Sequence, residues 1–232
     1  MATKTFALEA IGDIKVIKRQ GNRHLRLSIL PNGQVRVSIP TWAPYQAGID
    51  FARAKQDWID TKRPVRKPLS NGQIIGKTYK LSFVHDSVAA KPKSRLRGNC
   101  VEIICPEKMA ISDESAQLAA HRAIIRALKK QASMLLPKRI DELGKQHGIT
   151  FSQVKIKQMN CRWGSCDQKN NITFNLFLIQ LPWQLIDYVI LHELAHVNNL
   201  NHSAEFWRDL EQLAPNARQL KKRLNSYHPG II

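Results

Sequence analysis

The pentapeptide His192-Glu193-Leu194-Ala195-His196 constrains this chain more than any other feature, because it lies within an apolar stretch that has helical spacing. On an α-helix, His192 and His196 are one turn apart and project from the same face, so both imidazoles can reach one metal ion. Glu193 lies beside that face, where it can act as a general base on a metal-bound water without being a ligand. In an apolar helix these polar side chains would be destabilising without such a partner. The pattern therefore predicts a metal centre, with zinc as the ion.

A catalytic zinc site usually has three protein ligands and one open position. His202 is the leading candidate for the third ligand, because it follows His196 by six positions. The helix must then end in between, and the asparagines at 198 and 199 suit the left-handed conformation that stops a helix. Ser203 is expected to cap the next helix. The competing third ligand is a downstream glutamate, Glu205 or Glu211.

The segment before this helix carries a second set of candidate residues. Apolar and polar residues alternate from Ile172 to Leu178, which predicts a strand. Two interpretations fit this periodicity equally well: a strand whose free edge pairs with an extended peptide substrate, or an interior strand of a sheet. We assign Arg162, Trp163 and Asn175 as candidate substrate-binding residues, although the turn before the strand could instead have only a structural role.

Patterning along the chain predicts an α+β protein. Alternating apolar residues predict strands within the first 60 residues, at 74–84 and at 101–104, and helical spacing predicts a short helix over 45–60. From residue 112 the spacing becomes helical over a long stretch. Pro137 is expected to kink or break that helix, and Gly148 is expected to end it.

The change of pattern divides the chain into two expected domains. A strand-rich N-terminal domain with a short helix covers residues 1–110, and a compact catalytic domain covers residues 111–232. No internal repeat is evident in the sequence. The first twenty residues lack the apolar stretch of a signal peptide, and no apolar run approaches the roughly 20 residues that span a bilayer. We therefore expect a cytoplasmic protein without membrane contact; the sequence gives no indication of its oligomeric state.

The charge balance predicts a polyanionic partner. Thirty-six Lys and Arg residues against 18 Asp and Glu residues give a formal net charge of +18. Such a field attracts nucleic acid or nucleotides, so we expect contact with them through the basic surface, although no recognised nucleic-acid-binding motif is present. The basic residues concentrate in three clusters: Lys62, Arg63, Arg66 and Lys67; Lys91, Lys93, Arg95 and Arg97; and Arg218, Lys221, Lys222 and Arg223.

The four cysteines form two pairs, Cys100 with Cys105 and Cys161 with Cys166. Four residues separate the members of each pair, which is not the usual spacing of a zinc knuckle. A reducing compartment also disfavours disulfides. We expect these cysteines to be ordinary small apolar residues, with a second metal site as the alternative.

Four segments together, RWGSC, ITFN, IDYVILHELAH and LNHSAEFW, carry a family resemblance. They resemble the bacterial YgjP-like family of predicted metal-dependent hydrolases, which is related in its core to the SprT-like zinc metallopeptidases. The resemblance covers about residues 155–210. It implies a compact zincin-like core with His192, His196 and His202 as zinc ligands and Glu193 as the catalyst. SprT-like relatives act on DNA-associated proteins, which would suit the positive charge.

The histidine spacing also mimics the metzincin pattern, but two features of that pattern are missing. Asn199 replaces its glycine, and no methionine follows Met159, so the downstream methionine turn is absent. We therefore reject a metzincin assignment.

The expected function is that of a zinc-dependent hydrolase, first of all a metallopeptidase with a polypeptide substrate. A zinc-bound water, deprotonated by Glu193, would attack a carbonyl that the metal polarises. The first alternative is a pyrophosphatase that hydrolyses nucleotide phosphoanhydrides, with Arg162 and lysines holding the phosphates. The second alternative is a non-catalytic, DNA-associated zinc protein. The presence of Glu193 beside an apparent three-histidine site argues against it, because a closed structural site needs a fourth ligand and no base.

Overall fold

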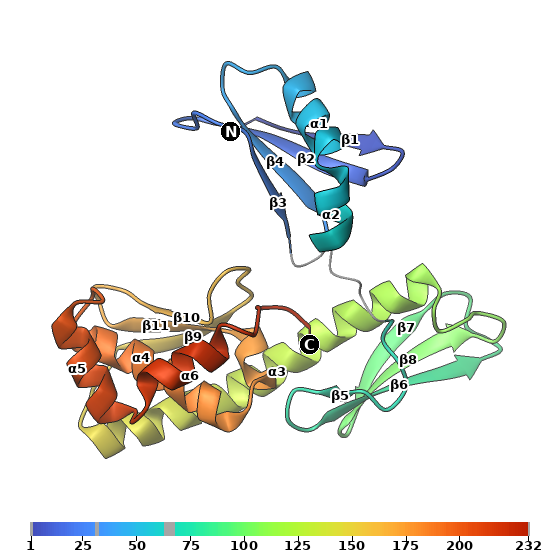
Figure 1. Cartoon of the computed structure of the whole chain (residues 1–232). Coiled ribbons are helices and arrows are strands. Elements are labelled where there is room, and N and C mark those ends of the chain that lie inside the picture. Colours follow the sequence, from blue (N-terminus) through green and yellow to red (C-terminus); the bar gives the residue numbers. More distant parts are fainter. Residues whose placement is uncertain (1, 31–32, 63–67, 232) are drawn as a thin grey trace. The chain divides into compact units, whose positions relative to one another are not determined.

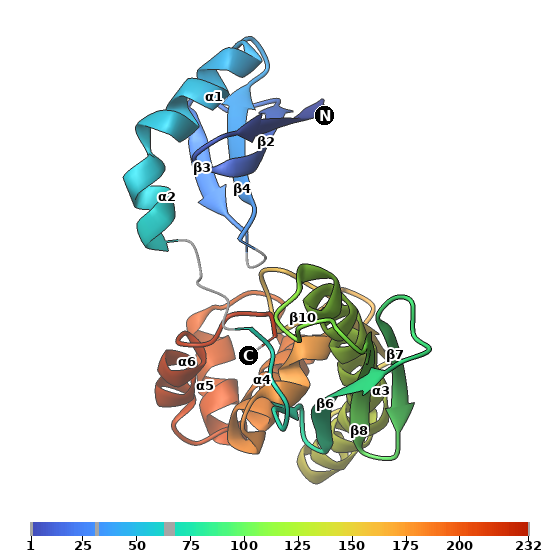
Figure 2. The same cartoon turned by 90° about the vertical axis from the view of Figure 1, so that its right-hand side faces the viewer.

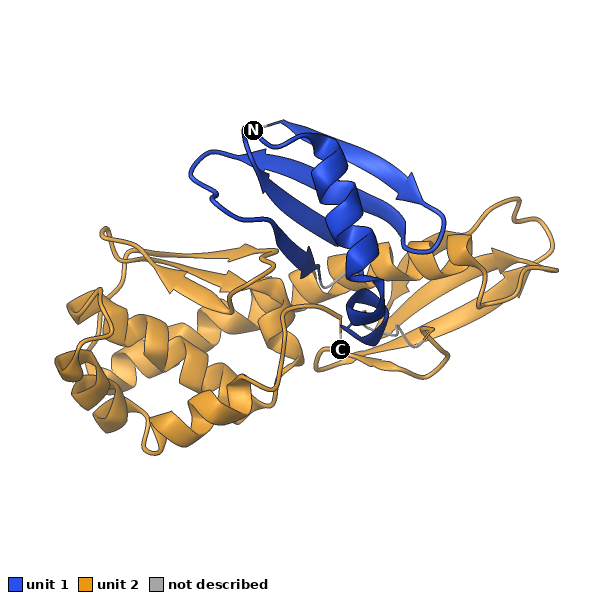
Figure 3. Ribbon diagram, turned by 45° about the horizontal axis from the view of Figure 1, so that its top comes forward, with its two compact units in different colours: residues 1–67 blue, residues 68–232 orange. Residues whose placement is uncertain are grey.

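A computed structural model describes residues 2–30, 33–62 and 68–231 of the chain. It shows an α+β protein, as the sequence predicts. The chain forms two compact units, Met1–Lys67 and Pro68–Ile232, each with its own hydrophobic core (Figure 3). No helix among the described residues is long and apolar enough to cross a membrane. Arg63, Arg66 and Lys67 of the first basic cluster lie outside the described residues.

The first unit is a four-stranded sheet with helices that follow it in the chain. Alternate side chains of the strands are buried, as in β4, where Val35, Val37 and Ile39 are fully buried. The first helix packs its apolar face, including Ile49 and Ala52, into the same core. The helix expected over 45–60 is divided in two at Lys55. The elements are β1 (Thr3–Leu8), β2 (Gly12–Arg19), β3 (Arg26–Ile29), β4 (Val35–Pro40), α1 (Tyr45–Ala54) and α2 (Gln56–Lys62).

The second unit begins with another four-stranded sheet that has the same topology as the first. The strand orders are β1-β2-β4-β3 and β5-β6-β8-β7. In each sheet two antiparallel hairpins join through a central parallel pair, β2 with β4 or β6 with β8, and a helix follows. The fold therefore contains a repeat that the sequence did not reveal. The second sheet consists of β5 (Ile74–Ile75), β6 (Tyr79–Asp86), β7 (Lys93–Arg97) and β8 (Cys100–Pro106).

The long helix α3 (Glu114–His147) connects this sheet to the rest of the second unit (Figure 1). Gly148 ends it in the left-handed conformation, as predicted. Pro137 was expected to kink or break the helix, but the helix continues through it. Buried residues on both sides of the proline, including Ala132, Leu136 and Ile140, pack into the core, and this packing offsets the missing backbone hydrogen bond.

The C-terminal part of the second unit packs against α3. The β5–β8 sheet packs along one part of α3 and α4 packs against the other, as Figure 1 and Figure 2 show. A three-stranded sheet of order β10-β11-β9 completes this part. Its strand β11 is therefore interior, which agrees with the second of the two interpretations of its periodicity, and β10 and β9 are the edge strands. The elements are β9 (Gln153–Lys157), β10 (Gly164–Cys166), β11 (Asn171–Asn175), η1 (Leu176–Gln180), α4 (Trp183–Asn198), α5 (Ala204–Leu213) and α6 (Ala217–Leu224).

The division expected near residue 110 lies inside the second unit, between β8 and α3. The β5–β8 sheet and α3 share one core, because apolar side chains of both elements are buried together. Phe83 and Ile103 from the sheet belong to the same cluster as Ile124 and Leu128 from the helix. The change from strand to helix periodicity therefore marks a change of element within one compact unit.

Candidate metal centre

Three histidines meet at the junction of α4 and α5. His192 and His196 come from α4, whereas His202 lies in the loop before α5. The metal-binding atoms that these residues can offer all lie within 4.8 Å of one another. Nε2 of His202 is 3.2 Å from Nε2 of His192. Two nitrogen ligands about 2.0–2.1 Å from a tetrahedral zinc ion are separated by about 3.3 Å, so this pair already has the spacing of two ligands.

Local sequence explains why the three residues converge. Helix α4 ends at Asn198 as predicted, but Asn199 takes an extended conformation instead of a left-handed one. Ser203 caps α5 as predicted, because its hydroxyl accepts a hydrogen bond from the Phe206 backbone N–H. The short segment between the two helices turns back and places His202 opposite His192. In the part of the chain that the structure describes, the group able to hold a metal includes neither Glu205 nor Glu211.

A hydrogen-bond relay from α5 orients His196. Nδ1 of His196 lies 2.9 Å from the carbonyl oxygen of Asn199, and the carbonyl can only accept, so Nδ1 carries the proton. Nε2 is therefore free to bind a metal. The Asn199 amide in turn donates to Oδ2 of Asp209 at 2.7 Å, which ties the loop to α5. Asp209 carries no signal in the sequence, because no spacing rule connects it with the histidines.

Phe206 forms a common wall behind the three imidazoles. Its ring is fully buried, and its centroid lies 5.0, 4.5 and 4.8 Å from those of His192, His196 and His202. Nδ1 of His192 is buried and has no hydrogen-bond partner among the described residues, so packing holds this ring in place. Sequence analysis recognised Phe206 only as an apolar residue of the following helix.

The electrostatics of the cluster favour the neutral imidazole at His192 and at His202. Burial lowers the pKa of His192 to about 3, and the neighbouring His196, His202 and Lys221 act in the same direction. Burial also lowers the pKa of His202, with contributions from His196 and Lys221. A neutral imidazole is the form that binds a metal. The donor set, its spacing and its protonation therefore fit a zinc ion.

Glu193 lies beside the histidines in a space that a glycine keeps open. Its side chain is 5% exposed, and burial raises its pKa to about 8, while Arg162 acts in the opposite direction. A Cβ atom added to Gly164 of β10 would lie 2.5 Å from Oε1 of Glu193 and 2.8 Å from its Cδ. Any side chain at position 164 would therefore displace the Glu193 carboxylate. Sequence analysis quoted this glycine within RWGSC but gave it no role.

The other three predicted site residues have different surroundings. Arg162 is exposed, and its charge acts on Glu193; Trp163 is half-buried. Asn175 is fully buried and accepts hydrogen bonds from the Met159 and Phe177 backbone N–H groups. Its amide donates to the carbonyl oxygens of Met159 and Arg162 at 2.7 and 2.8 Å. Asn175 therefore fixes the loop that carries Arg162, and its burial does not favour direct substrate contact.

A cationic pocket adjoins the histidine cluster. It is lined by Trp207, Arg218 and Lys221. The Trp207 ring centroid is 6.5 Å from that of His202, and the Lys221 ammonium lies 4.6 Å from the centre of the Trp207 ring. An aromatic face and two cations thus lie next to the candidate metal position. Arg218 and Lys221 of the C-terminal basic cluster therefore lie beside the site.

The four cysteines take no part in a metal group within the described residues. All four are free thiols. Cys105 is fully buried in the core, whereas Cys161 is exposed. Burial raises the pKa of Cys166 to about 11, with Glu193 and Asp167 acting in the same direction.

A comparison with protein families decides the assignment. The YgjP-like metallopeptidase domain matches residues 23–227 of the 232 residues. The chain belongs to the YgjP-like family. This YgjP-like protein is accordingly a metal-dependent hydrolase with a metallopeptidase domain. No curated protein matches its sequence.

Two solved structures show limited similarity to this YgjP-like chain. One is the metallopeptidase zymogen abylysin of Pyrococcus abyssi, with 20% identity and a TM-score of 0.37 over 42% of this chain and 100% of that one. The other is the metallopeptidase zymogen jannalysin of Methanocaldococcus jannaschii, with 20% identity and a TM-score of 0.36 over 39% of this chain and 94% of that one. These scores are too low to support an argument, so the family assignment depends on the sequence match.

Proposed function

We propose that this protein is a zinc metallopeptidase in which His192, His196 and His202 hold the ion and Glu193 is the general base. The observation that carries the proposal is the convergence of three imidazole nitrogens beside a buried carboxylate. Three histidine ligands leave one position of a tetrahedral zinc open, which is typical of catalytic rather than structural sites.

In this proposal a bound zinc ion would polarise the scissile carbonyl and lower the pKa of water. The buried Glu193 carboxylate accepts the proton of the attacking water and then donates it to the leaving amine nitrogen. Gly164 leaves the space that the carboxylate occupies during both transfers. The Asn199 carbonyl and Asp209 keep Nε2 of His196 directed at the ion.

Strand β10 supports a polypeptide as the substrate. It is an edge strand of the three-stranded sheet, and Gly164 of this strand adjoins Glu193. An extended peptide that pairs with β10 would therefore pass beside the general base. In this proposal the substrate pairs with the edge strand β10 and not with the interior strand β11.

The test compares the zinc-loaded wild type with Glu193→Ala on an unfolded polypeptide. We expect cleavage by the wild type and a loss of at least about 100-fold in the variant, because general-base catalysis contributes about that much. Glu107→Ala, which removes an exposed glutamate after β8, is the matched control and should retain activity. Equal cleavage by the wild type and Glu193→Ala would refute the proposed role.

A second candidate function is hydrolysis of nucleotide phosphoanhydrides. The observation that favours it is the pocket lined by Trp207, Arg218 and Lys221, which offers a base-stacking face and two phosphate-binding cations next to the histidines. Incubation with nucleoside triphosphates separates the two functions. Nucleotide hydrolysis that is lost in Glu193→Ala, with the polypeptide left intact, would establish the second candidate and refute the peptidase. Polypeptide cleavage without nucleotide hydrolysis would do the opposite.

A further inference from the structure

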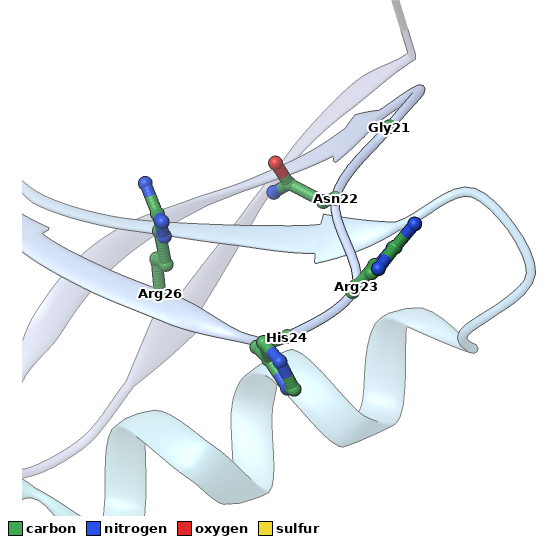
Figure 4. A pocket seen from close by; sticks show the side chains of 5 residues that line it. All are labelled: Gly21, Asn22, Arg23, His24 and Arg26. Carbon is green, nitrogen blue, oxygen red and sulfur yellow. The ribbon is translucent and has the colours of Figure 1, made fainter.

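A basic pocket lies in the first unit, in the connection between β2 and β3. It is lined by Gly21, Asn22, Arg23, His24 and Arg26. Figure 4 shows these residues along the turn and at the start of β3. Among the residues that the structure describes, no carboxylate lines the pocket, and Glu9 and Asp13 lie at the opposite end of β2. The pocket therefore presents cations and an amide without a competing acidic group.

Two donors of this turn lack an acceptor. Arg19 Nε and Asn22 Nδ2 are buried, and neither makes a hydrogen bond among the described residues. A buried donor without an acceptor costs free energy, and an anion bound in the pocket, which Asn22 lines, would offer an acceptor oxygen to Nδ2 of Asn22. Arg23 and Arg26 add guanidinium groups that match the oxygens of a phosphate.

An exposed tryptophan lies at the same end of the sheet as this turn. Strands β2 and β4 are parallel, with Arg19 opposite Pro40, so both strands terminate at this end of the sheet. Lys18 Nζ donates to the Thr41 carbonyl oxygen at 3.1 Å, which fixes the next residues against the end of β2. The following side chain, Trp42, is 77% exposed. An exposed aromatic ring at the same end of a sheet as a basic pocket offers a face on which a base can stack while the pocket holds a phosphate of the same strand.

The second sheet shows that the fold itself does not require this chemistry. Its corresponding connection, residues 87–92 between β6 and β7, also has six residues, with the sequence Ser-Val-Ala-Ala-Lys-Pro. It contains one lysine and no arginine, although the two sheets have the same topology. The first connection, residues 20–25, also carries one basic residue of this kind, Arg23, so the two connections differ in chemistry and not in charge. The guanidinium of Arg23 and the amide of Asn22 are specific to the first connection.

We propose that the end of the first sheet that carries this pocket binds the phosphate backbone of single-stranded nucleic acid, with a base stacked on Trp42. Arg23, Arg26 and the Asn22 amide bind a phosphate, and the attached nucleoside places its base against the indole. This site is independent of the histidine cluster and does not depend on the proposed peptidase function.

Anisotropy titrations of a fluorescent oligothymidylate with the full-length protein test the proposal. Arg23→Ala/Arg26→Ala and Trp42→Ala should each raise the Kd by about tenfold. The double variant should also reduce the slope of log K against log salt by about one for each phosphate that the protein no longer neutralises. Lys91→Ala/Lys93→Ala is the matched control, because it also lowers the net charge from +18 by two. Lys91 lies in the corresponding connection of the second sheet, and Lys93 is the first residue of β7, as Arg26 is the first residue of β3. It should bind as the wild type does.

Thermal melting by circular dichroism verifies that each variant is folded. Competition by inorganic phosphate and by thymidine monophosphate identifies the source of the phosphate. Weak competition by both supports a polymer, whereas displacement by the mononucleotide at a concentration similar to that of the oligonucleotide would overturn the polymer in favour of a free nucleotide. Equal weakening in both double variants, or a wild type that does not bind the oligonucleotide, would refute the site.

Discussion

Replacement of Gly164 by alanine tests whether the space next to Glu193 controls catalysis. The new Cβ would lie 2.5 Å from Oε1 and 2.8 Å from Cδ and Cγ of Glu193. Ordinary separations begin at about 3.5 Å, so the carboxylate must move by about 1 Å. A misplacement of this size costs about 100-fold in rate. We therefore expect Gly164→Ala to lower kcat about 100-fold.

Metal content and stability should change little in this variant. The backbone of Gly164 is not in the left-handed region, so the strand backbone can hold an alanine. The smaller entropy of the unfolded chain contributes about 0.4–1 kcal/mol in favour of folding, which offsets part of the cost of the contact with Glu193. The assay measures polypeptide cleavage, zinc content and urea unfolding in parallel. Gly230→Ala is the control, since a Cβ there meets no atom within 4 Å and its φ is also ordinary.

A double variant sharpens this test. If the alanine acts only by displacing the carboxylate, Gly164→Ala should cause no further loss of activity in a Glu193→Ala background. Full activity of Gly164→Ala would refute the reasoning. Loss of zinc together with activity would show that the glycine supports the metal site as a whole instead of the general base.

Three further predictions concern the support of the metal. Phe206→Ala removes a fully buried ring that contacts all three histidines. We expect the free energy of unfolding in urea titrations to fall by about 3–5 kcal/mol, together with weaker zinc binding. Unchanged zinc affinity would contradict the role of Phe206 as a wall of the site. Asp209→Ala removes the acceptor of the Asn199 amide and should weaken zinc binding by about 10- to 100-fold, as measured by competition with a chelating dye, while the melting temperature stays close to that of the wild type. Removal of metal by a chelator should abolish hydrolysis and lower the melting temperature. Zinc added back at about 100 times its Kd should restore about 2.7 kcal/mol of unfolding free energy. A melting temperature that does not respond to zinc would argue against a bound ion in this fold.

Local pattern was sufficient for the helix that carries the candidate site. The spacing of His192 and His196 within apolar residues predicted a buried helix with both imidazoles on one face, and α4 has this form. Ser203 as the cap of α5 and Gly148 as the end of α3 were also predicted, because capping depends on one residue and its immediate neighbours. Pro137 did not break its helix, because distant core residues hold both halves in place.

The sequence by itself determined the elements whose signals are local: the helix with two histidines one turn apart, the adjacent glutamate, the caps and the overall excess of positive charge. Only the tertiary structure decided which distant side chains meet. Gly164 reaches Glu193 because β10 packs beside α4, and Asp209 reaches the His196 relay because α5 folds back along α4. Strand order likewise placed β11 inside the sheet and left β10 at its edge. Periodicity records which face of an element is buried, whereas packing between elements determines what that face meets.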